Sequence, residues 1–367
     1  MITQVLSINP DSPQLEYIIK AAEILRNGGI VAFPTETVYG LAANFFDEKA
    51  LKRLREVKHR PEGKPFTVQI ADLEDMERFK CEQSPFAREL MEKFWPGPLT
   101  LIFNTAASGK IGIRLPNNVI AQELIRKSET LIAAPSANIS GQNPSRDAKE
   151  VLRQFKDKIE LVLDAGQTQL GKESTIVDLT VTPYKIARTG VIPRDKIAQV
   201  ELDFWKTKVG PAIKKILFVC TGNSCRSAMA EGYLKKRLKE IERDDIRVFS
   251  RGVSAHGVPG PTAETLEVLK AEGVDMANHR PMALMNNDIE SADLILAMED
   301  FQIDEIREMA PHKKDRVFLL AEFGLWGGRV QDTSLEIPDP IGKPLNVYKD
   351  VFGLIKNSIE RLVKILI

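Results

Sequence analysis

Residues 220–227, Cys-Thr-Gly-Asn-Ser-Cys-Arg-Ser, combine a thiol nucleophile with groups that bind an oxyanion. The apolar run 216–219 predicts a strand before them, and helical spacing of apolar residues predicts a helix after them. A loop at a helix start presents backbone N–H groups and the positive helix end to an anion. We expect this field to lower the pKa of Cys220, while Arg226 offers a planar fork of donors to phosphate. Ser227 can donate a hydrogen bond to the thiolate.

A buried structural cysteine is the ordinary alternative for Cys220. Gly222 and Asn223 argue against it, because both tolerate the positive φ angles that a tight cradle needs. The order Cys, five residues, Arg, Ser resembles the active-site loop of the low-molecular-weight protein tyrosine phosphatase family. The resemblance extends over about residues 214–367. It implies a central parallel sheet flanked by helices, a cysteinyl-phosphate intermediate, a phosphorylated protein substrate and no cofactor.

That family also uses an acid on an Asp-Pro loop near the C-terminus, and this chain carries Pro338-Asp339-Pro340. The two prolines restrict the local backbone and hold Asp339 extended, so its carboxylate can be aimed at a small entropic cost. An ordinary turn aspartate is the alternative. The resemblance assigns Asp339 the role of general acid. The segment 290–298 reads as a buried strand of the same domain.

The substrate of this half stays open between phosphotyrosine and phosphoarginine. Ser224 places a hydroxyl where many tyrosine phosphatases have an apolar residue, and Ile341 and Gly342 stand where those enzymes tend to carry aromatic residues. A polar loop residue could bind a guanidinium nitrogen of phosphoarginine. Alternatively, Ser224 is simply a small loop residue and Trp326 supplies the aromatic wall.

The whole chain has 367 residues, which is enough for two domains with separate cores. We expect domains at 1–205 and 215–367, joined by a linker at 206–214 that mixes charge with Gly210-Pro211. The 51 basic and 51 acidic side chains balance, so no global field favours nucleic acid or a membrane. No apolar run approaches a membrane span, and no signal peptide is evident.

The three cysteines cannot form a disulfide framework, which favours a reducing cytoplasm. The four histidines have no metal-ligand spacing, so we expect no metal site and place each histidine on the surface or in a turn.

In the first half, a buried-strand pattern at 29–33 leads into a loop at 34–41 and then a helix that ends at Lys58-His59-Arg60-Pro61. Together with Lys64, Lys58 and Arg60 would make a compact positive site. A solvated basic helix end is the alternative. Further polar groups follow expected strands, namely Ser136 and Asn138 after 131–134, Ser174 before 176–177, and Arg188 near the end of the domain. Open α/β sheets present such groups around a ligand crevice.

Six fragments of this half, in order, resemble the YrdC-type threonylcarbamoyl-AMP synthases over about residues 5–205. They are Phe33–Leu41, Lys58-x-Arg60-Pro61, Trp95–Thr100, Arg114–Pro116, Pro135–Asn138 and Ser174–Asp178. The resemblance implies a twisted open α/β sheet with a deep positive groove. It also implies that L-threonine, bicarbonate and ATP become threonylcarbamoyl-AMP and pyrophosphate, in the pathway that modifies adenosine in tRNA. A tRNA or a tRNA-modifying enzyme would then be a partner.

A carbamate that attacks an α-phosphorus brings two anions together, so the site must neutralise charge. Lys58 would act as a point charge on the triphosphate and Arg60 as a bidentate partner for a carboxylate or phosphate. The resemblance further implies a set of binding residues: Thr35, Arg114 and Ser174 for threonine, and Ser136, Asn138 and Arg188 for the nucleotide or carbamoyl group. Mg²⁺ is expected on the phosphates, although no acidic cluster indicates a dedicated metal site.

In a competing interpretation, the first half is a module that binds RNA, including double-stranded RNA, and only the phosphatase half is catalytic. Against it, the basic residues cluster at one helix end, and an aromatic content of 7% gives few stacking platforms. A third interpretation keeps one domain as an inactive scaffold. The presence of the chemistry-bearing residues in both halves argues against this.

Overall fold

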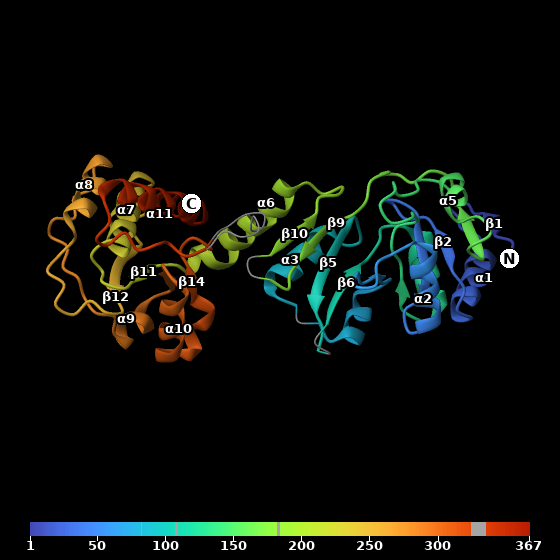
Figure 1. Ribbon diagram of the computed structural model, residues 1–367, viewed down its shortest axis with the longest axis horizontal. Coiled ribbons are helices and arrows are strands. Elements are labelled where there is room, and N and C mark those ends of the chain that lie inside the picture. Colours follow the sequence, from blue (N-terminus) through green and yellow to red (C-terminus); the bar gives the residue numbers. More distant parts are fainter. Residues whose placement is uncertain (82, 107–108, 182–183, 324–334) are drawn as a thin grey trace. The chain divides into compact units, whose positions relative to one another are not determined.

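The computed structural model describes residues 1–81, 83–106, 109–181, 184–323 and 335–367, without the side chains of 208 and 209. These residues form two compact units, 1–200 and 201–367, each with its own sheet and core (Figure 1). The boundary lies within a helix, α6 (Arg194–Phe204). Residues 206–214, which we expected to link the domains, are partly helical and belong to the second unit.

The first unit contains a mixed sheet of ten strands among the described residues, in the order β1-β8-β2-β3-β7-β4-β6-β5-β9-β10. Its strands are β1 (Gln4–Ser7), β2 (Val31–Phe33), β3 (Gly40–Asn44), β4 (Thr67–Gln69), β5 (Leu99–Asn104), β6 (Lys110–Arg114), β7 (Ile132–Ala133), β8 (Leu161–Asp164), β9 (Thr175–Asp178) and β10 (Lys185–Arg188). The pairs β1–β8, β2–β8, β4–β6 and β5–β9 are parallel, and the other neighbours are antiparallel. The expected open α/β sheet is confirmed.

Helices cover this sheet through separate apolar clusters. They are α1 (Leu15–Arg26), α2 (Glu48–Val57), α3 (Pro85–Phe94), α4 (Val119–Ser128), α5 (Ala148–Phe155) and α6, with the short 3₁₀ helix η1 (Leu73–Phe79). Helices α1 and α4 share one cluster, α2 and α5 a second, and α3 and α6 a third. Helix α2 begins where the Asp47 carboxylate accepts hydrogen bonds from the N–H groups of Lys49 and Ala50, which caps its first turn. Because this cap fixes where α2 begins, it also helps to fix the position of Lys58, which follows the last residue of the helix.

Among its described residues, the second unit has a parallel sheet of four strands in the order β12-β11-β13-β14. Its elements are β11 (Lys215–Cys220), α7 (Arg226–Glu240), β12 (Arg247–Gly252), α8 (Ala263–Ala271), α9 (Asn286–Ser291), β13 (Leu294–Ala297), α10 (Asp300–Met309), β14 (Val317–Leu319) and α11 (Leu345–Leu366), with short helical turns η2 (Trp205–Val209), η3 (Gly210–Ala212) and η4 (Pro311–Arg316). The strand expected at 290–298 is only Leu294–Ala297, because the residues before it finish helix α9.

Alternating side chains of β11 face opposite sides of this sheet, as the pleat requires. Ile216 and Phe218 pack in a cluster with α7 and α11, whereas Leu217 and Val219 pack in another with α9 and α10. Figure 1 shows helices on both faces of the sheet. The expected parallel sheet flanked by helices is confirmed, and it places Cys220 at the carboxyl end of a central strand.

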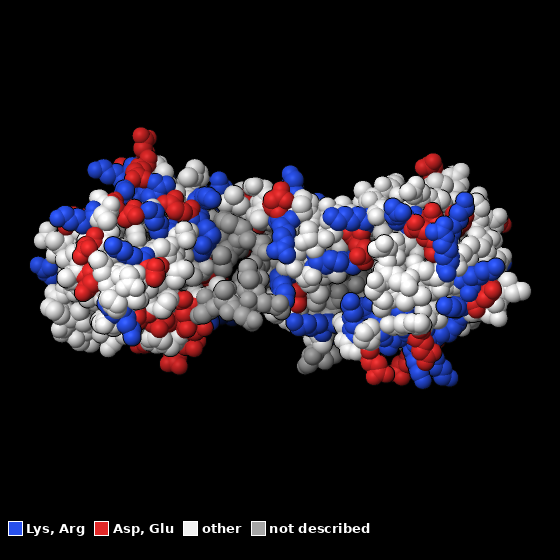
Figure 2. Space-filling view, turned by 45° about the horizontal axis from the view of Figure 1, so that its top comes forward, with Lys and Arg blue, Asp and Glu red and all other residues white. Residues whose placement is uncertain are grey.

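The surface of the visible face carries both signs of charge, with Lys and Arg interspersed among Asp and Glu (Figure 2). This distribution agrees with the equal numbers of basic and acidic residues. None of the described helices is both long enough and apolar enough to span a membrane.

Candidate functional site: a basic cavity and a cysteine loop

A cavity of about 630 Å³ lies in the first unit, where several strands end. That volume is within the usual range for small-molecule sites. The structure brings to it all eight residues that the sequence singled out in this half: Thr35, Lys58, Arg60, Arg114, Ser136, Asn138, Ser174 and Arg188. They come from six separate segments of the chain, so the sheet is what gathers them.

Lys58 follows α2 directly and turns its ammonium toward the loop after β7. Its Nζ donates to the carbonyl oxygens of Ser136 and Asn138, the latter at 2.5 Å. The Lys58 side chain is buried, and the pKa of Lys58 is lowered to about 7, chiefly by burial and then by the nearby Arg60 charge. The expected point charge is therefore a titratable group near neutral pH.

The same loop is held by its own polar side chains. The Ser136 hydroxyl donates to Asn138 Oδ1 at 2.6 Å, and Asn138 Nδ2 donates to the carbonyl oxygen of Gln142 at 2.8 Å. These bonds fix the backbone carbonyls that Lys58 contacts. Lys58, Ser136 and Asn138 thus form one hydrogen-bonded unit on one side of the cavity.

Arg60 lines the cavity beside Lys58, and a turn of the chain orients it. Its Nη2 donates to the carbonyl oxygen of Pro65 at 2.6 Å, and its guanidinium lies 5.1 Å from the ring centroid of Phe66. Burial, then the Arg55 charge, lowers the pKa of Arg60. An anion in the cavity would offset this cost of burying a charge.

Thr35 reaches the cavity, but its hydroxyl is used inside its own loop. Thr35 Oγ1 donates to the carbonyl oxygen of Val38 at 2.7 Å and accepts from the backbone N–H of Thr37 at 3.2 Å. This bonding shapes the turn between β2 and β3. A ligand in the cavity would therefore contact the Thr35 segment mainly by packing against its surface, and not through a hydrogen bond to the Thr35 hydroxyl.

Arg114, at the end of β6, is buried and paired with Glu36. Its Nε donates to the carbonyl oxygen of Gly97 at 3.2 Å, and its Nη2 lies 2.7 Å from Glu36 Oε1. The two atoms of the ion pair are close, but their alignment falls outside hydrogen-bond geometry. Nη2 therefore retains donor capacity for a carboxylate in the cavity.

On the opposite strands, a chain of polar contacts joins β5, β9 and β10. The hydroxyls of Ser174 and Thr100 lie 2.9 Å apart, and Arg188 Nη2 donates to Ser174 Oγ at 3.2 Å. Arg188 also pairs with Glu173 at 2.5 Å, and burial lowers the pKa of Arg188. The site thus holds the hydroxyl groups of Ser174 and Thr100 next to the Arg188 guanidinium.

In the second unit, the loop 221–225 folds around the sulfur of Cys220. The N–H of Asn223 donates to Cys220 Sγ at 3.2 Å, and Ser227 Oγ lies 2.9 Å from it. Asn223 has a φ of 54°, the left-handed conformation that the sequence anticipated. A Cβ on Gly252 would lie 2.5 Å from the carbonyl oxygen of Thr221, so only glycine lets β12 approach the loop this closely.

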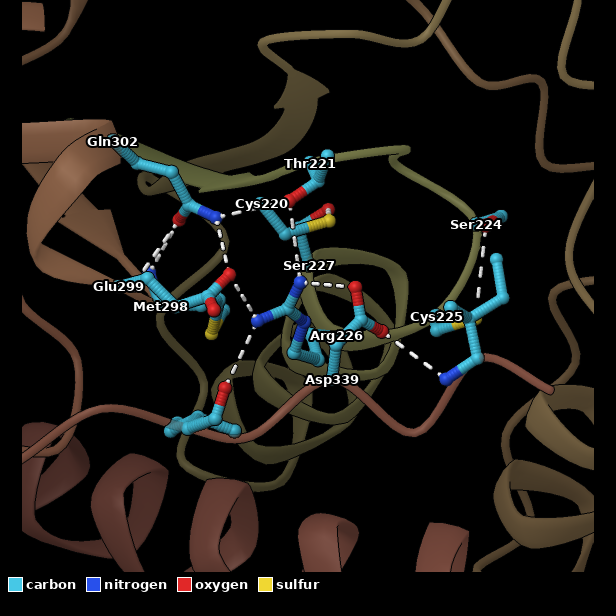
Figure 3. Close-up of polar contacts among 12 residues, drawn as sticks. Cys220, Thr221, Ser224, Cys225, Arg226, Ser227, Met298, Glu299, Gln302 and Asp339 are labelled. Atoms are coloured by element: carbon cyan, nitrogen blue, oxygen red, sulfur yellow. Dashed lines mark hydrogen bonds and ion pairs between the residues drawn. The ribbon is translucent and has the colours of Figure 1, made fainter. Parts of the chain in front are cut away.

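Arg226 is buried beneath the loop, where two carboxylates hold it (Figure 3). Its Nη1 donates to Glu299 Oε2 at 2.6 Å and its Nη2 to Asp339 Oδ2 at 2.5 Å. Gln302 Nε2 donates to Glu299 at 3.0 Å and to the Thr221 hydroxyl at 3.3 Å. The structure therefore brings Cys220, Arg226, Ser227 and Asp339 together, as the sequence predicted, and adds Glu299 and Gln302.

The expected lowering of the Cys220 pKa is wrong. Burial raises the pKa of the Cys220 thiol, and hydrogen bonds from Ser227 and Asn223 and the Arg226 charge only oppose this shift in part. Arg226 shares its charge with Glu299 and Asp339, which weakens its effect on the sulfur. The sequence did not reveal these two carboxylate contacts, because both partners lie more than 70 residues away.

A network behind the loop includes residues that the sequence did not single out. Asn223 Nδ2 donates to Ser227 Oγ at 2.9 Å and to Ser250 Oγ at 2.7 Å, and Ser250 donates to Glu231. His279 Nε2 lies 2.8 Å from the Asn223 carbonyl oxygen, and its side chain is only 8% exposed. His279 closes a turn that begins at Met276, which is one of the two positions expected for it, but its side chain is buried and supports the left-handed Asn223.

Ser224, which could bear on specificity, is buried at the floor of the loop. Its hydroxyl lies 3.6 Å from Cys225 Sγ, and Cys225 in turn lies 3.8 Å from the Tyr348 hydroxyl. Ile341, beyond the acid loop, is exposed. Trp326, the alternative aromatic wall, lies outside the described residues.

These observations define a class: an α/β protein with a basic, nucleotide-sized cavity in one unit and a cysteine-based phosphate loop in the other. Comparison with protein families gives two matches. The model of Sua5, YciO and YrdC proteins, described as telomere recombination, matches residues 23–190. The family model of low molecular weight phosphotyrosine protein phosphatases matches residues 215–366.

Individual relatives match the first unit. The threonylcarbamoyl-AMP synthase of Pyrococcus abyssi is 42% identical over 202 residues, which cover 53% of this chain and 58% of the relative. That of Bacillus subtilis is 39% identical over 209 residues, 54% of this chain and 59% of the relative. A putative threonylcarbamoyl-AMP synthase of Mycobacterium tuberculosis is 35% identical over 192 residues, 50% of this chain and 88% of the relative. The chain thus spans little more than half the length of the first two relatives.

Among solved structures, that of P. abyssi Sua5 complexed with L-threonine has a TM-score of 0.52 and 29% identity. The match covers 86% of this chain and 99% of that chain. A doubly substituted variant of the same protein reaches 31% identity at the same TM-score, with 98% of that chain covered. The chain belongs to the Sua5/YciO/YrdC family through its first unit, and its second unit is a domain of the low-molecular-weight phosphatase family.

Proposed function

We propose that the chain is a bifunctional enzyme, a threonylcarbamoyl-AMP synthase followed by a protein phosphatase. The first activity would convert L-threonine, bicarbonate and ATP into threonylcarbamoyl-AMP, pyrophosphate and water. The observation that carries this proposal is the cavity, where three guanidinium groups and Lys58 surround hydroxyl and amide groups. Two anionic reactants need such positive charge in one place.

Within that cavity, the Arg114 guanidinium, which also pairs with Glu36, binds the threonine carboxylate, and Ser174 and Thr100 offer hydroxyls to the threonine side chain. Lys58 and Arg60 neutralise the triphosphate, and Ser136, Asn138 and Arg188 position the nucleotide and carbamoyl groups. The threonine nitrogen attacks the carbon derived from bicarbonate, and the resulting carbamate oxygen attacks the α-phosphorus. Pyrophosphate leaves, with its developing charge held by the cations.

Mg²⁺ would accompany ATP as a phosphate-bound ion. The described residues hold no group of three His, Cys, Asp or Glu side chains that could bind a metal ion. Glu173, an acidic residue that lines the cavity, is already paired with Arg188. The chain's residues therefore fit a metal carried by the triphosphate better than a dedicated protein site. The adenylate product would pass to a tRNA-modifying enzyme in the cytoplasm.

ATP binding should take up a proton through Lys58. The pKa of Lys58 is lowered to about 7, so at pH 8 the buried amine is mostly neutral, whereas an arriving triphosphate favours the ammonium. Calorimetry of ATP binding at pH 8 should therefore give enthalpies that depend on the ionisation heat of the buffer, with uptake of up to about one proton. The Lys58→Met variant should lose this dependence. An equal dependence in both proteins would contradict the assignment.

The second activity would hydrolyse a phosphorylated protein. Because burial raises the pKa of Cys220, the thiol would pass its proton to the Asp339 carboxylate as the sulfur attacks phosphorus. Asp339 would give that proton to the leaving group, and water would then hydrolyse the cysteinyl phosphate to phosphate and the free thiol. A phosphate bound by the Nη groups of Arg226 would take the position of the Asp339 carboxylate, because the other Nη contacts are to Glu299, Ile337 and Thr221. Displacement would free Asp339 to face the leaving group, while Glu299 keeps Arg226 in place.

The phosphorylated residue would be arginine rather than tyrosine, since Ser224 is polar and small at the loop floor. We expect Ser224→Ile to lower kcat/KM for a phosphoarginine peptide, relative to a matched phosphotyrosine peptide, by about tenfold, the equivalent of one hydrogen bond. Equal selectivity in wild type and variant would show that Ser224 does not set specificity. Phosphotyrosine would then be the substrate.

A further inference from the structure

Gln69 ends strand β4 directly beside the end of β6. In the parallel ladder, Gln69 is the Cα partner of Arg114, so the two side chains leave the same face of the sheet at neighbouring positions. Both line the cavity of the first unit. The backbones that carry the uncharged amide and the guanidinium are thus about one strand spacing apart, roughly 4.8 Å.

The Gln69 amide is buried and half satisfied. Its side chain is 3% exposed, and its Nε2 lies 3.5 Å from the carbonyl oxygen of Ala134. Its Oε1 has no hydrogen-bond partner among the described residues. Because a buried acceptor without a donor is unfavourable, this oxygen is suited to a ligand that brings an N–H or O–H group.

Neighbouring acceptors in the cavity already have partners. Thr35 Oγ1 accepts from the loop N–H groups, Glu173 pairs with Arg188, and the hydroxyls of Thr100 and Ser174 contact each other. Within the part of the chain that the structure describes, Gln69 Oε1 is the buried cavity-lining side-chain acceptor that lacks a donor. Because Gln69 is adjacent to Arg114, we expect both side chains to contact the same ligand.

We propose that Gln69 Oε1 binds the α-amino N–H of threonine while Arg114 binds the α-carboxylate, an assignment that rests on the proposed synthase function. The amino and carboxylate groups share one carbon atom, which suits receptors on adjacent strands. The same N–H persists in the carbamate, so the contact survives the first chemical step. Gln69 is thus a substrate-binding residue that holds the reacting nitrogen.

An amide suits this position better than a carboxylate would. The amine must be neutral to attack the carbon derived from bicarbonate, and a carboxylate at position 69 would stabilise its ammonium form. A second carboxylate, in addition to Glu36, would also compete with the substrate for Arg114. A neutral acceptor orients the nitrogen without either effect.

The test compares two ligands of the full chain by isothermal calorimetry. L-Threonine has the amino group, and (R)-3-hydroxybutanoate keeps the carboxylate and hydroxyl but lacks the amine. Gln69→Met, which retains the shape of the side chain, should weaken threonine binding about tenfold, as expected for one lost hydrogen bond to a substrate amine. Binding of 3-hydroxybutanoate should not change. Gln69→Asn, which withdraws the acceptor by one methylene, should behave in the same way.

The outcomes separate this inference from the synthase proposal. If the wild type binds neither ligand while thermal melting shows it folded, the threonine site itself is wrong. If the wild type binds threonine and both variants keep its full preference over 3-hydroxybutanoate, Gln69 does not bind the amine. An equal weakening of both ligands would mean that Gln69 only shapes the pocket, which also overturns the inference.

Discussion

Replacing Cys220 by serine should lower phosphate release by at least about 10⁴-fold and leave threonine-dependent pyrophosphate release within about twofold of wild type. In the proposed mechanism the Cys220 sulfur, which Ser227 and the N–H of Asn223 contact, is the nucleophile, and a serine hydroxyl is far less ionised than a thiol. The synthase residues lie in the other compact unit, so their geometry does not depend on this atom. Parallel assays of phosphate and pyrophosphate on the full chain measure both effects.

Cys81→Ser is the matched control for this experiment. Cys81 is a half-buried free cysteine of the first unit, outside both sites. It should leave phosphate release unchanged. Loss of both activities in a Cys220→Ser protein that remains folded would contradict the assignment of separate sites.

Lys58→Met should have the opposite effect. We expect pyrophosphate release to fall by about 10²–10³-fold, the usual cost of removing one preorganised group that stabilises developing charge. Phosphate release should stay within about twofold. The reason is that Lys58 joins the loop of Ser136 and Asn138 to the place where the triphosphate would lie.

Lys52→Met provides the control, because Lys52 is an exposed lysine of the same helix, α2, and does not line the cavity. It should leave both activities unchanged. Pyrophosphate release that survives intact in Lys58→Met would remove Lys58 from the synthase mechanism.

Local sequence was sufficient for the cysteine loop. Cys220, Arg226 and Ser227 follow one another within eight residues, and the strand and helix on either side have clear apolar periodicity. The eight residues expected in the first unit also share one cavity: six of them lie at or near strand ends, and Lys58 and Arg60 follow helix α2. Strand-end positions therefore carried most of the predictable information.

Contacts between distant segments were not predictable from these patterns. Nothing local to Glu299 or His279 indicates that one would hold Arg226 and the other the carbonyl of Asn223. The pKa of Cys220 depends on that same environment, since burial and the shared charge of Arg226 decide its direction. The loop sequence alone therefore predicts the wrong direction for the shift of the Cys220 pKa.

Gln69 and Thr35 illustrate the same limit in the cavity. The sequence did not single out Gln69, which belongs to no recognised motif, and only the pairing of β4 with β6 sets it beside Arg114. Thr35 belongs to a recognisable motif, but its hydroxyl bonds to its own loop. Strand register and side-chain bonding decide which polar groups are free for a ligand.

The most direct test of the synthase assignment is the identity of the nucleotide product. The full chain is incubated with L-threonine, ¹³C-labelled bicarbonate, ATP and Mg²⁺, and the products are examined by mass spectrometry. The account predicts an adenylate that contains threonine and one ¹³C atom, formed in step with pyrophosphate and reduced by the same large factor in Lys58→Met. Release of AMP or ADP without a labelled threonine adduct, from protein that binds ATP, would contradict it.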